Sequence, residues 1–167
     1  MTMAVVRQRG EGEYLVFAGG GTFTIKASSA ETGGSLMIFE DRVVRGKMTP
    51  LHKHPNMEEA IYLLEGELLV HVDGEELPVS EGSLVVVPRG VPHALLGTSE
   101  TARLLCTLAP GASGEAFFRD ASDPASSELE VRPPDFDRLR ACAERSDSIE
   151  ILGPPPFAAV RQAQSVR

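Results

Sequence analysis

The sequence predicts an all-β fold whose strands form two facing sheets or close into a barrel. Runs of apolar and β-branched residues are short, recur at intervals of about 8–12 residues and are separated by turns that contain Gly or Pro. At 167 residues the chain is long enough for one domain with its own hydrophobic core. Helical spacing of apolar residues is confined to the last third, which predicts one or two short C-terminal helices.

The first third of the chain contains three predicted strands. Residues 14–17 and 22–26 are short β-like runs on either side of a turn at Gly19-Gly20-Gly21, and residues 35–44 form a longer run. Residues 1–13 carry little pattern, so we expect them to form an arm or a first edge strand.

The middle of the chain reads as a series of short antiparallel strands. Asp73-Gly74 is a two-residue hairpin signal, because both residues tolerate the left-handed backbone of the turn. We expect a second hairpin turn at residues 64–67, and a corner that contains Pro88 and Gly90. The expected strands cover residues 59–65, 68–72, 76–79, 84–87, 95–96 and 104–108.

The last third of the chain has a different pattern. Residues 115–119 indicate one helical turn or more, and residues 123–134, which are polar and contain proline, indicate a loop. An apolar residue at every third position predicts an amphipathic helix over residues 135–145. Residues 149–152 read as a short extended segment before Gly153-Pro-Pro-Pro156. We expect the second helix to be a lid or a dimer contact rather than a source of catalytic groups.

Three histidines and one glutamate have the residue types and spacing of a metal site. His52 and His54 are one residue apart, so a strand turns both imidazoles to the same face. Glu59 comes five positions after His54, an offset that a continuous strand would send to the opposite face. Pro55-Asn56 breaks the run, so a new strand can return the carboxylate to the same interior. His93 follows later, and imidazole nitrogens and carboxylate oxygens are both ligands of transition metals.

These residues belong to two motifs that resemble the signature motifs of the cupin superfamily. The first reads Gly46-x5-His52-x-His54-x4-Glu59-x6-Gly66, and the second reads Gly82-x5-Pro88-x-Gly90-x2-His93. The second motif usually ends in Asn, where this chain has Gly97. The similarity covers residues 34–110, and the flanks are more loosely similar to single-domain cupins of the quercetin 2,3-dioxygenase type.

The resemblance implies a double-stranded β-helix, or jelly-roll, barrel in which His52, His54, Glu59 and His93 hold one metal ion near the centre. The ligand types leave Fe, Mn, Ni, Co, Cu and Zn open as the ion, and a cupin that has lost its metal is the alternative. No organic cofactor site is indicated. His71 lies on the face opposite its neighbours Val70 and Val72, so we expect no metal role for it.

The chain divides into three expected regions. Residues 1–33 are predicted to pack on the barrel as N-terminal strands and an arm, residues 34–112 to form the cupin barrel core, and residues 113–167 to form a helical extension and tail. Cys106 and Cys142 do not make a disulfide framework, and we expect both to be small buried hydrophobic residues.

Charge and hydropathy exclude several functions. The chain has 16 basic and 24 acidic residues, which gives a net charge of −8 at pH 7. Such a chain is unsuited to nucleic acid, whose phosphates need clustered Lys and Arg, and to anionic lipid. No apolar run approaches the ~20 residues of a membrane span, and residues 1–9 lack the apolar region of a secretory signal. We therefore expect a cytoplasmic protein without nucleic-acid or membrane partners.

The resemblance favours a metal-dependent oxygenase of the dioxygenase type that acts on a small organic substrate, aromatic or otherwise apolar. In this interpretation Glu59 is the catalytic residue, which either remains a ligand or swings free to accept a proton from a substrate hydroxyl. Ile61, Leu63 and Leu95 would suit such a substrate, although core packing is their commoner role. Two alternatives stay open: a non-redox isomerase or lyase that uses the ion as a Lewis acid, and a small-molecule-binding protein without turnover.

A homodimer is a further expectation from the resemblance, because pairing between copies covers open sheet edges. Tyr62 lies on the face of its strand opposite Glu59, so we expect it to pack between sheets or between subunits.

Overall fold

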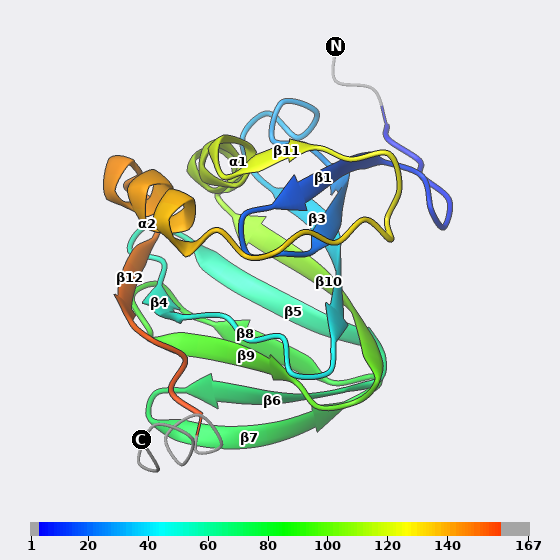
Figure 1. Ribbon diagram of the computed structural model, residues 1–167. Coiled ribbons are helices and arrows are strands. Elements are labelled where there is room, and N and C mark those ends of the chain that lie inside the picture. The colour runs from blue at the N-terminus through cyan, green and yellow to red at the C-terminus, as the bar shows by residue number, and fades with distance from the viewer. Residues whose placement is uncertain (1–3, 158–167) are drawn as a thin grey trace.

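The computed structural model describes residues 4–157, which form two antiparallel β-sheets facing each other across a shared core (Figure 1). The strand order is β11-β1-β2-β3-β10-β5-β8 in the larger sheet and β12-β4-β9-β6-β7 in the smaller. This is the double-sheet barrel that the sequence predicts. The strands are β1 (Glu13–Phe17), β2 (Thr22–Ala27), β3 (Met37–Val44), β4 (Leu51–Lys53), β5 (Glu58–Glu65), β6 (Glu67–Val72), β7 (Glu75–Ser80), β8 (Leu84–Val87), β9 (His93–Gly97), β10 (Thr101–Ala109), β11 (Ser122–Pro124) and β12 (Glu150–Gly153), and the helices are α1 (Gly111–Asp120) and α2 (Phe136–Arg145).

Alternation of side chains explains why the two sheets close over a core. On β5, Ile61 and Leu63 are 2% and 1% exposed, whereas Tyr62 between them is 42% exposed. Because successive residues of a strand point to opposite faces, β5 and β10 bury every second side chain against the facing sheet. Tyr62 therefore does not pack between the two sheets of this chain. The cluster that joins the sheets includes Met37, Phe39, Met57, Ile61, Leu63, Leu68, Leu104 and Leu108.

One predicted hairpin is confirmed and the other is wrong. Asp73 and Gly74 have φ angles of 50° and 87°, and they connect the paired strands β6 and β7. At Gly66, by contrast, the chain crosses from one sheet to the other, because β5 pairs with β10 and β8 while β6 pairs with β7 and β9. A Cβ at Gly66 would lie 2.4 Å from the Thr101 carbonyl oxygen, so this crossing needs glycine. Two strands around a glycine have the same local pattern in either case.

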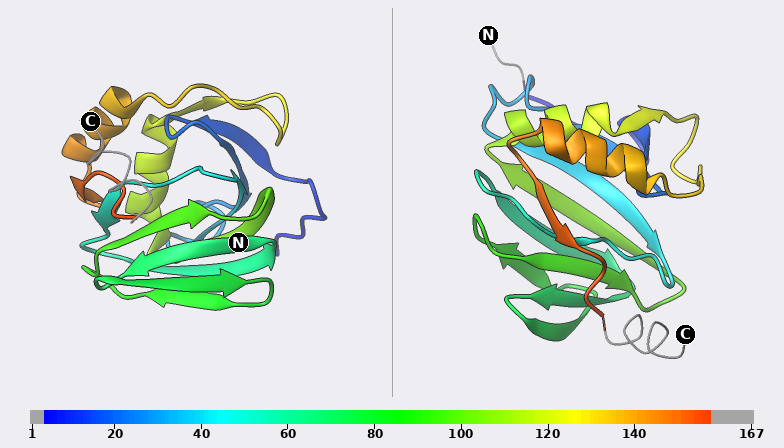
Figure 2. Two further views of the ribbon diagram at one scale, coloured as in Figure 1. Left: turned by 60° about the horizontal axis from the view of Figure 1, so that its bottom comes forward. Right: turned by 60° about the vertical axis from the view of Figure 1, so that its left-hand side comes forward.

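The C-terminal third covers one end of the barrel, where α1 lies beside β11 and α2 lies beside α1 and β12 (Figures 1 and 2). Phe117 and Phe118 of α1 pack with Phe17 of β1, with ring centroids 6.1 and 5.3 Å from it, so the two rings cap this end of the barrel. Helix α2 begins after Asp135, whose side chain accepts a hydrogen bond from the Arg138 N–H. The loop predicted over residues 123–134 is wrong at its start, because residues 123 and 124 belong to β11, which pairs with β1.

The remaining structural expectations concern the ends and the cysteines. Cys106 and Cys142 are both free and buried, as predicted. No helix within residues 4–157 is long and apolar enough to cross a membrane. Two expected regions lie partly outside the described residues: the arm over residues 1–13 at its start, and the extension over residues 113–167 at its end. Strands β1 and β2 continue the larger sheet beyond β3, and the three-region division stays a prediction.

Candidate metal centre

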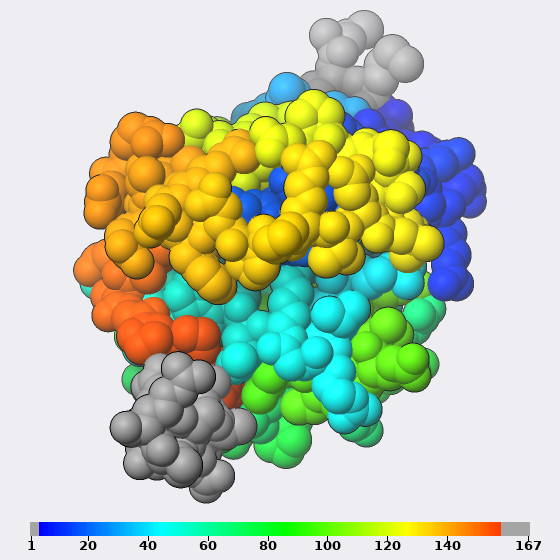
Figure 3. Space-filling view, in the orientation of Figure 1, coloured from blue at the N-terminus to red at the C-terminus, as the bar shows by residue number. Residues whose placement is uncertain are grey.

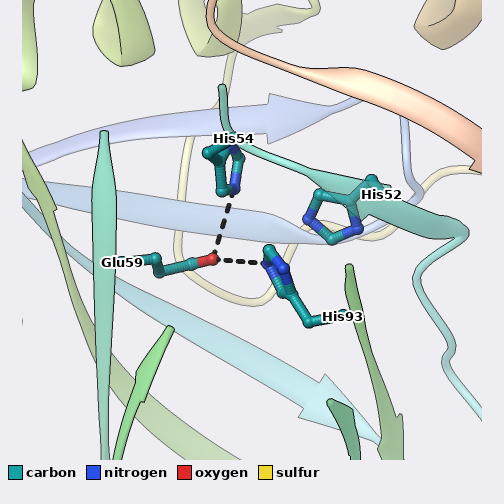
Figure 4. A group of neighbouring side chains, drawn as sticks. All are labelled: His52, His54, Glu59 and His93. Atoms are coloured by element: carbon teal, nitrogen blue, oxygen red, sulfur yellow. Dashed lines mark hydrogen bonds and ion pairs between the residues drawn. The ribbon is translucent and has the colours of Figure 1, made fainter. Parts of the chain in front are cut away.

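Two of the predicted histidines come from β4 and the residue that follows it. His52 lies in β4, and His54 follows two positions later, so both rings turn into the barrel (Figure 4). His52 pairs directly with His93 at the start of β9, and their ring centroids are 4.2 Å apart. The smaller sheet therefore supplies three imidazoles on one interior face.

Glu59 approaches from the opposite sheet. It lies near the start of β5, between Leu108 of β10 and Val87 of β8. The predicted break at Pro55-Asn56 is present as a bend between β4 and β5, and it carries the chain from the smaller sheet to the larger one. Its geometry is held by a hydrogen bond from the Gly90 N–H to the His54 carbonyl, 2.8 Å long, so the two sequence motifs contact each other here.

The structure brings all four predicted residues together. One potential ligand atom from each lies within 4.8 Å of the others, and the side chains point toward one another (Figure 4). Oε2 of Glu59 is 3.0 Å from His93 Nε2 and 3.3 Å from His54 Nε2. Adjacent ligand atoms that each lie 2.0–2.2 Å from one ion are about 3 Å apart, so this spacing suits a shared cation. All four residues are between 1% and 9% exposed.

Each histidine ring is oriented by a backbone carbonyl. Nδ1 of His52 contacts the Pro50 carbonyl at 2.9 Å, that of His54 contacts Ser148 at 2.9 Å, and that of His93 contacts Val91 at 3.0 Å. Because a carbonyl oxygen can only accept, each Nδ1 carries the hydrogen and the lone pair of the neutral ring sits on Nε2. This is the arrangement that fixes metal-binding imidazoles in proteins.

The electrostatics of the metal-free cluster show how closely the four groups are coupled. Burial, together with the neighbouring rings of His93 and His54, lowers the pKa of His52 to about 3. Burial opposes ionisation of Glu59, yet hydrogen bonds from His54 and His93 hold its pKa well below the ordinary value. Burial also opposes protonation of His93, but contact with Glu59 raises its pKa. Without a metal, a proton on His93 therefore neutralises the carboxylate.

The donor set fits a transition-metal ion. An unprotonated Nε2 at 3.0 Å from a carboxylate oxygen is repulsive unless a proton or a cation lies between the two atoms. A proton can relieve this for one pair, whereas a divalent cation satisfies three imidazoles and one carboxylate at once. His71 is not part of this cluster: its ring lies edge-on to that of Phe157, with centroids 6.4 Å apart.

The cluster forms one wall of a cavity of about 100 Å³. Leu95 lines this cavity, whereas Ile61 and Leu63 belong to the buried core, so the core interpretation holds for two of the three residues proposed as substrate contacts. Phe136 and Leu139 of α2 also line it, which places the helix where a lid would be. Figure 3 shows the segment from β11 to α2 (yellow to orange) crossing the surface of the molecule, with N-terminal residues (blue) visible in a hollow behind it.

The sequence analysis missed two charged cavity residues, Asp41 and Lys47. The signal for Asp41 was present in β3, because the period of two that buries Met37, Phe39 and Val43 also turns residue 41 inward. Lys47 has no comparable signal, since it lies between Gly46 and a short bridge outside the named strands.

Gly97 stands where the second motif usually has Asn, and its environment gives a physical reason for a glycine. A Cβ at this position would lie 2.4 Å from the Val44 carbonyl oxygen. Its backbone also accepts a hydrogen bond from the Gly46 N–H at 2.9 Å. Glycine at position 97 therefore allows the chain to pack closely against residues 44–46, and the departure from the motif removes no metal ligand.

Comparison with known proteins gives consistent results. Residues 40–108 match the sequence model of the family described as "Cupin domain". Quercetin 2,3-dioxygenase of Bacillus subtilis (strain 168) is 28% identical over 152 residues, which are 89% of this chain and 44% of that protein. L-ectoine synthase of Halomonas elongata is 32% identical over 124 residues, which are 72% of this chain and 89% of that protein. The chain thus spans less than half of the first relative and most of the second.

A solved structure is also similar. The polyketide cyclase RemF from Streptomyces resistomycificus superposes with a TM-score of 0.54 at 25% identity, over 66% of this chain and 80% of that one.

Proposed function

The chain belongs to the cupin family, and on that premise we propose that it is a metal-dependent oxygenase, of the dioxygenase type, for a small organic substrate. The observation that carries the proposal is the four-donor cluster in the wall of a cavity whose other walls are mainly apolar and aromatic. Such a cavity favours dioxygen and an apolar substrate over water. The similarity to quercetin 2,3-dioxygenase, which runs over 89% of this chain, supports the oxygenase class.

His52, His54, Glu59 and His93 would hold one divalent ion of Fe, Mn, Ni, Co, Cu or Zn. When bound, such an ion supplies Lewis acidity and open coordination positions beside the cavity. The protein's contribution is orientation, because the three carbonyls that accept from Nδ1 keep each ring from rotating.

Glu59 is the proposed catalytic residue. Its carboxylate is ionised, buried and on the cavity wall, so it can accept a proton from a substrate hydroxyl that enters the site. Phe39 and Phe118, with ring centroids 5.0 Å apart, provide an aromatic wall for the body of the substrate. One water-sized position needs about 10–15 Å³. The cavity of about 100 Å³ therefore suits a molecule with about one ring, unless α2 moves and enlarges it.

The test begins with elemental analysis of protein purified without added metal, which should show about one transition-metal ion per chain. The double variant His52→Ala/His54→Ala should lose this ion, and the matched variant His71→Ala should keep it. Oxygen electrode measurements on a panel of phenols and other small aromatic compounds then test the reaction. Unchanged metal in the double variant refutes the ligand assignment, and no oxygen uptake at full occupancy refutes the oxygenase.

A second function is favoured by a specific observation, the similarity to two proteins whose names denote no oxygenase. L-ectoine synthase is covered over 89% of its length and the polyketide cyclase over 80%. In a non-redox isomerase or lyase of this kind, Glu59 would move a proton within the substrate and dioxygen would not be consumed. Product formation under anaerobic conditions distinguishes this reaction from an oxygenase. Tight ligand binding without any product, at full metal occupancy, indicates a binding protein instead.

We also propose that the protein forms a homodimer and that its other partner is a small molecule, with no nucleic acid or membrane. The outer face of β5 and of the edge strand β8 supports the dimer, because Leu84 and Val86 are 61% and 56% exposed there and Tyr62 lies beside Leu84.

A further inference from the structure

We propose that Asp41 and Lys47 form a polar subsite in the same cavity, in which the Lys47 ammonium binds an anionic oxygen of the ligand. The ligand class would then be a small aromatic acid, whose ring contacts the phenylalanine wall. This inference rests on the proposed function only in that the ligand enters the cavity beside the four-donor cluster.

Asp41 occupies a position that the fold otherwise reserves for apolar side chains. It faces inward on β3 between Phe39 and Val43, which are each 4% exposed, and it lies opposite Leu104 of β10. A carboxylate at such a position loses hydration and lowers stability unless it is paired. Its partner in the described part of the chain is Lys47. A costly pair on a cavity wall is a candidate for ligand recognition.

Lys47 is incompletely satisfied by this pair. Its Nζ lies 3.3 and 3.4 Å from the two Asp41 oxygens, and these are its hydrogen-bond partners among residues 4–157. Charge-assisted hydrogen bonds of this kind are usually about 2.7–2.9 Å long. An ammonium has three N–H donors, so at least one donor remains for a ligand in the cavity that Lys47 lines.

The neighbouring pair Lys26–Glu40 shows the difference. Glu40 adjoins Asp41 on β3 but faces the outside of the barrel, and the side chain of Lys26 is 13% exposed, compared with 18% for Lys47. Besides Glu40, Lys26 Nζ donates to the carbonyls of Gln8 and Glu11 at 2.8 and 2.7 Å. Two lysines of similar burial beside β3 therefore differ in unused hydrogen-bonding capacity, and the one with the unused donor lines the cavity.

The surroundings favour a ligand with one negative charge. Phe23 and Phe39, with ring centroids 5.4 Å apart, lie beside Asp41 on the cavity wall and suit an aromatic ring. Lys47 and Asp41 cancel each other's charge, whereas a divalent ion would exceed the charge of Glu59 by one. With the ion bound, the cavity as a whole would then attract a monoanion, and without the ion the Lys47 donor is what would distinguish an anion from its neutral analogue.

Gly21 supplies a way to move the ammonium without removing its charge. A Cβ at this position would lie 2.5 Å from Lys47 Nζ and 3.4 Å from its Cε. The glycine turn after β1 therefore closes over the end of the lysine side chain. Gly21→Ala should push Nζ away from its present position, because the side-chain end can shift whereas the backbone of the turn cannot.

The experiment compares benzoate with benzamide, a neutral analogue of the same shape, by calorimetry on the metal-free protein, where no ion can attract the carboxylate. Benzoate should bind the wild-type protein about tenfold more tightly than benzamide, as expected for a charge-assisted hydrogen bond. Lys47→Met should abolish this preference, Gly21→Ala should reduce it, and the control Lys26→Met should keep it. Equal binding of the two ligands, no saturable benzoate binding, or equal effects of Lys47→Met and Lys26→Met would overturn the subsite.

Folding and function are separated by two further measurements. If Lys47→Met leaves Asp41 unpaired and unfolds the protein, the double variant Asp41→Asn/Lys47→Met restores a neutral site, and it should also lack the benzoate preference. Retention of the preference in that folded variant would overturn the subsite. A Lys47-dependent preference in a protein that consumes no oxygen would refute the oxygenase and leave the subsite intact.

Discussion

Glu59, Ile61 and Leu63 lie on one face of β5. Glu59 belongs to the polar cluster inside the barrel, whereas Ile61 and Leu63 belong to the apolar core. All three are buried, with exposures of 7%, 2% and 1%. Ile61 and Leu63 pair with Cys106 and Leu104 of β10 in the apolar core, whereas Glu59 contacts two imidazoles. Burial of apolar surface stabilises the fold by about 25 cal/mol per Å², while a buried charge loses hydration. Burial alone therefore does not separate structural from functional residues; the partners do.

The largest expected effect on stability is at Leu63, in the apolar core. Leu63→Ala should lower the free energy of unfolding by about 2–5 kcal/mol, because it removes methyl groups and leaves a cavity among buried neighbours. Urea denaturation measures the change, and metal content per folded chain should stay the same. Leu129→Ala, at a position 66% exposed in the turn between β11 and α2, is the matched control and should change stability by less than about 0.5 kcal/mol. Equal effects of the two variants would contradict the comparison.

In the polar cluster, Glu59→Gln should chiefly affect metal binding. Loss of a second-shell partner weakens metal affinity about 10–100-fold, and loss of a direct anionic ligand should weaken it by at least as much. The metal-free protein should be destabilised less than by Leu63→Ala, since Gln has nearly the same size and can still hydrogen bond to His93. Chelator competition and urea denaturation provide the two measurements. Wild-type metal affinity in the variant would show that Glu59 is not a ligand.

The contribution of His52 to the stability of the metal-free protein should fall in acid, whereas the contribution of Leu63 should not change. With a folded pKa of about 3, His52 stays neutral while the unfolded chain takes up a proton below pH 6.5. The unfolded state therefore gains stability as the pH falls through the window from 6.5 to 3. Relative to wild type, His52→Gln should gain about 1–2 kcal/mol between pH 8 and pH 5. The loss caused by Leu63→Ala should be the same at both pH values, and a constant His52→Gln difference would contradict this account.

The smallest effect on stability is expected on the outer face of the barrel. Val86 is 56% exposed on β8, whereas the next residue, Val87, is 1% exposed. Val86→Glu should change the unfolding free energy of the subunit by about 0.5 kcal/mol or less, yet convert the proposed homodimer to a monomer in light scattering. A wild-type protein that is already monomeric would refute the dimer, and a dimeric variant would place the interface elsewhere.

Local sequence patterns determined much of this protein. The alternation of residues predicts the strands, the spacing of His52, His54, Glu59 and His93 predicts the cluster, and Asp73-Gly74 predicts the hairpin. These features follow from properties that act over a few residues, namely which face a side chain takes and which φ angles a residue tolerates. The apolar spacing over residues 135–145 likewise predicts α2.

Only the tertiary structure decided which strands pair and which buried residues meet. The pattern around Gly66 fits a hairpin as well as a crossing, and long-range packing against Thr101 selects the crossing. Leu95 lines the cavity while Ile61 and Leu63 fill the core, although all three are apolar residues in strands. The pairing of Asp41 with Lys47 depends on how a loop settles against β3. Such contacts join residues that are distant along the chain or lie outside regular strands, so no local periodicity encodes them.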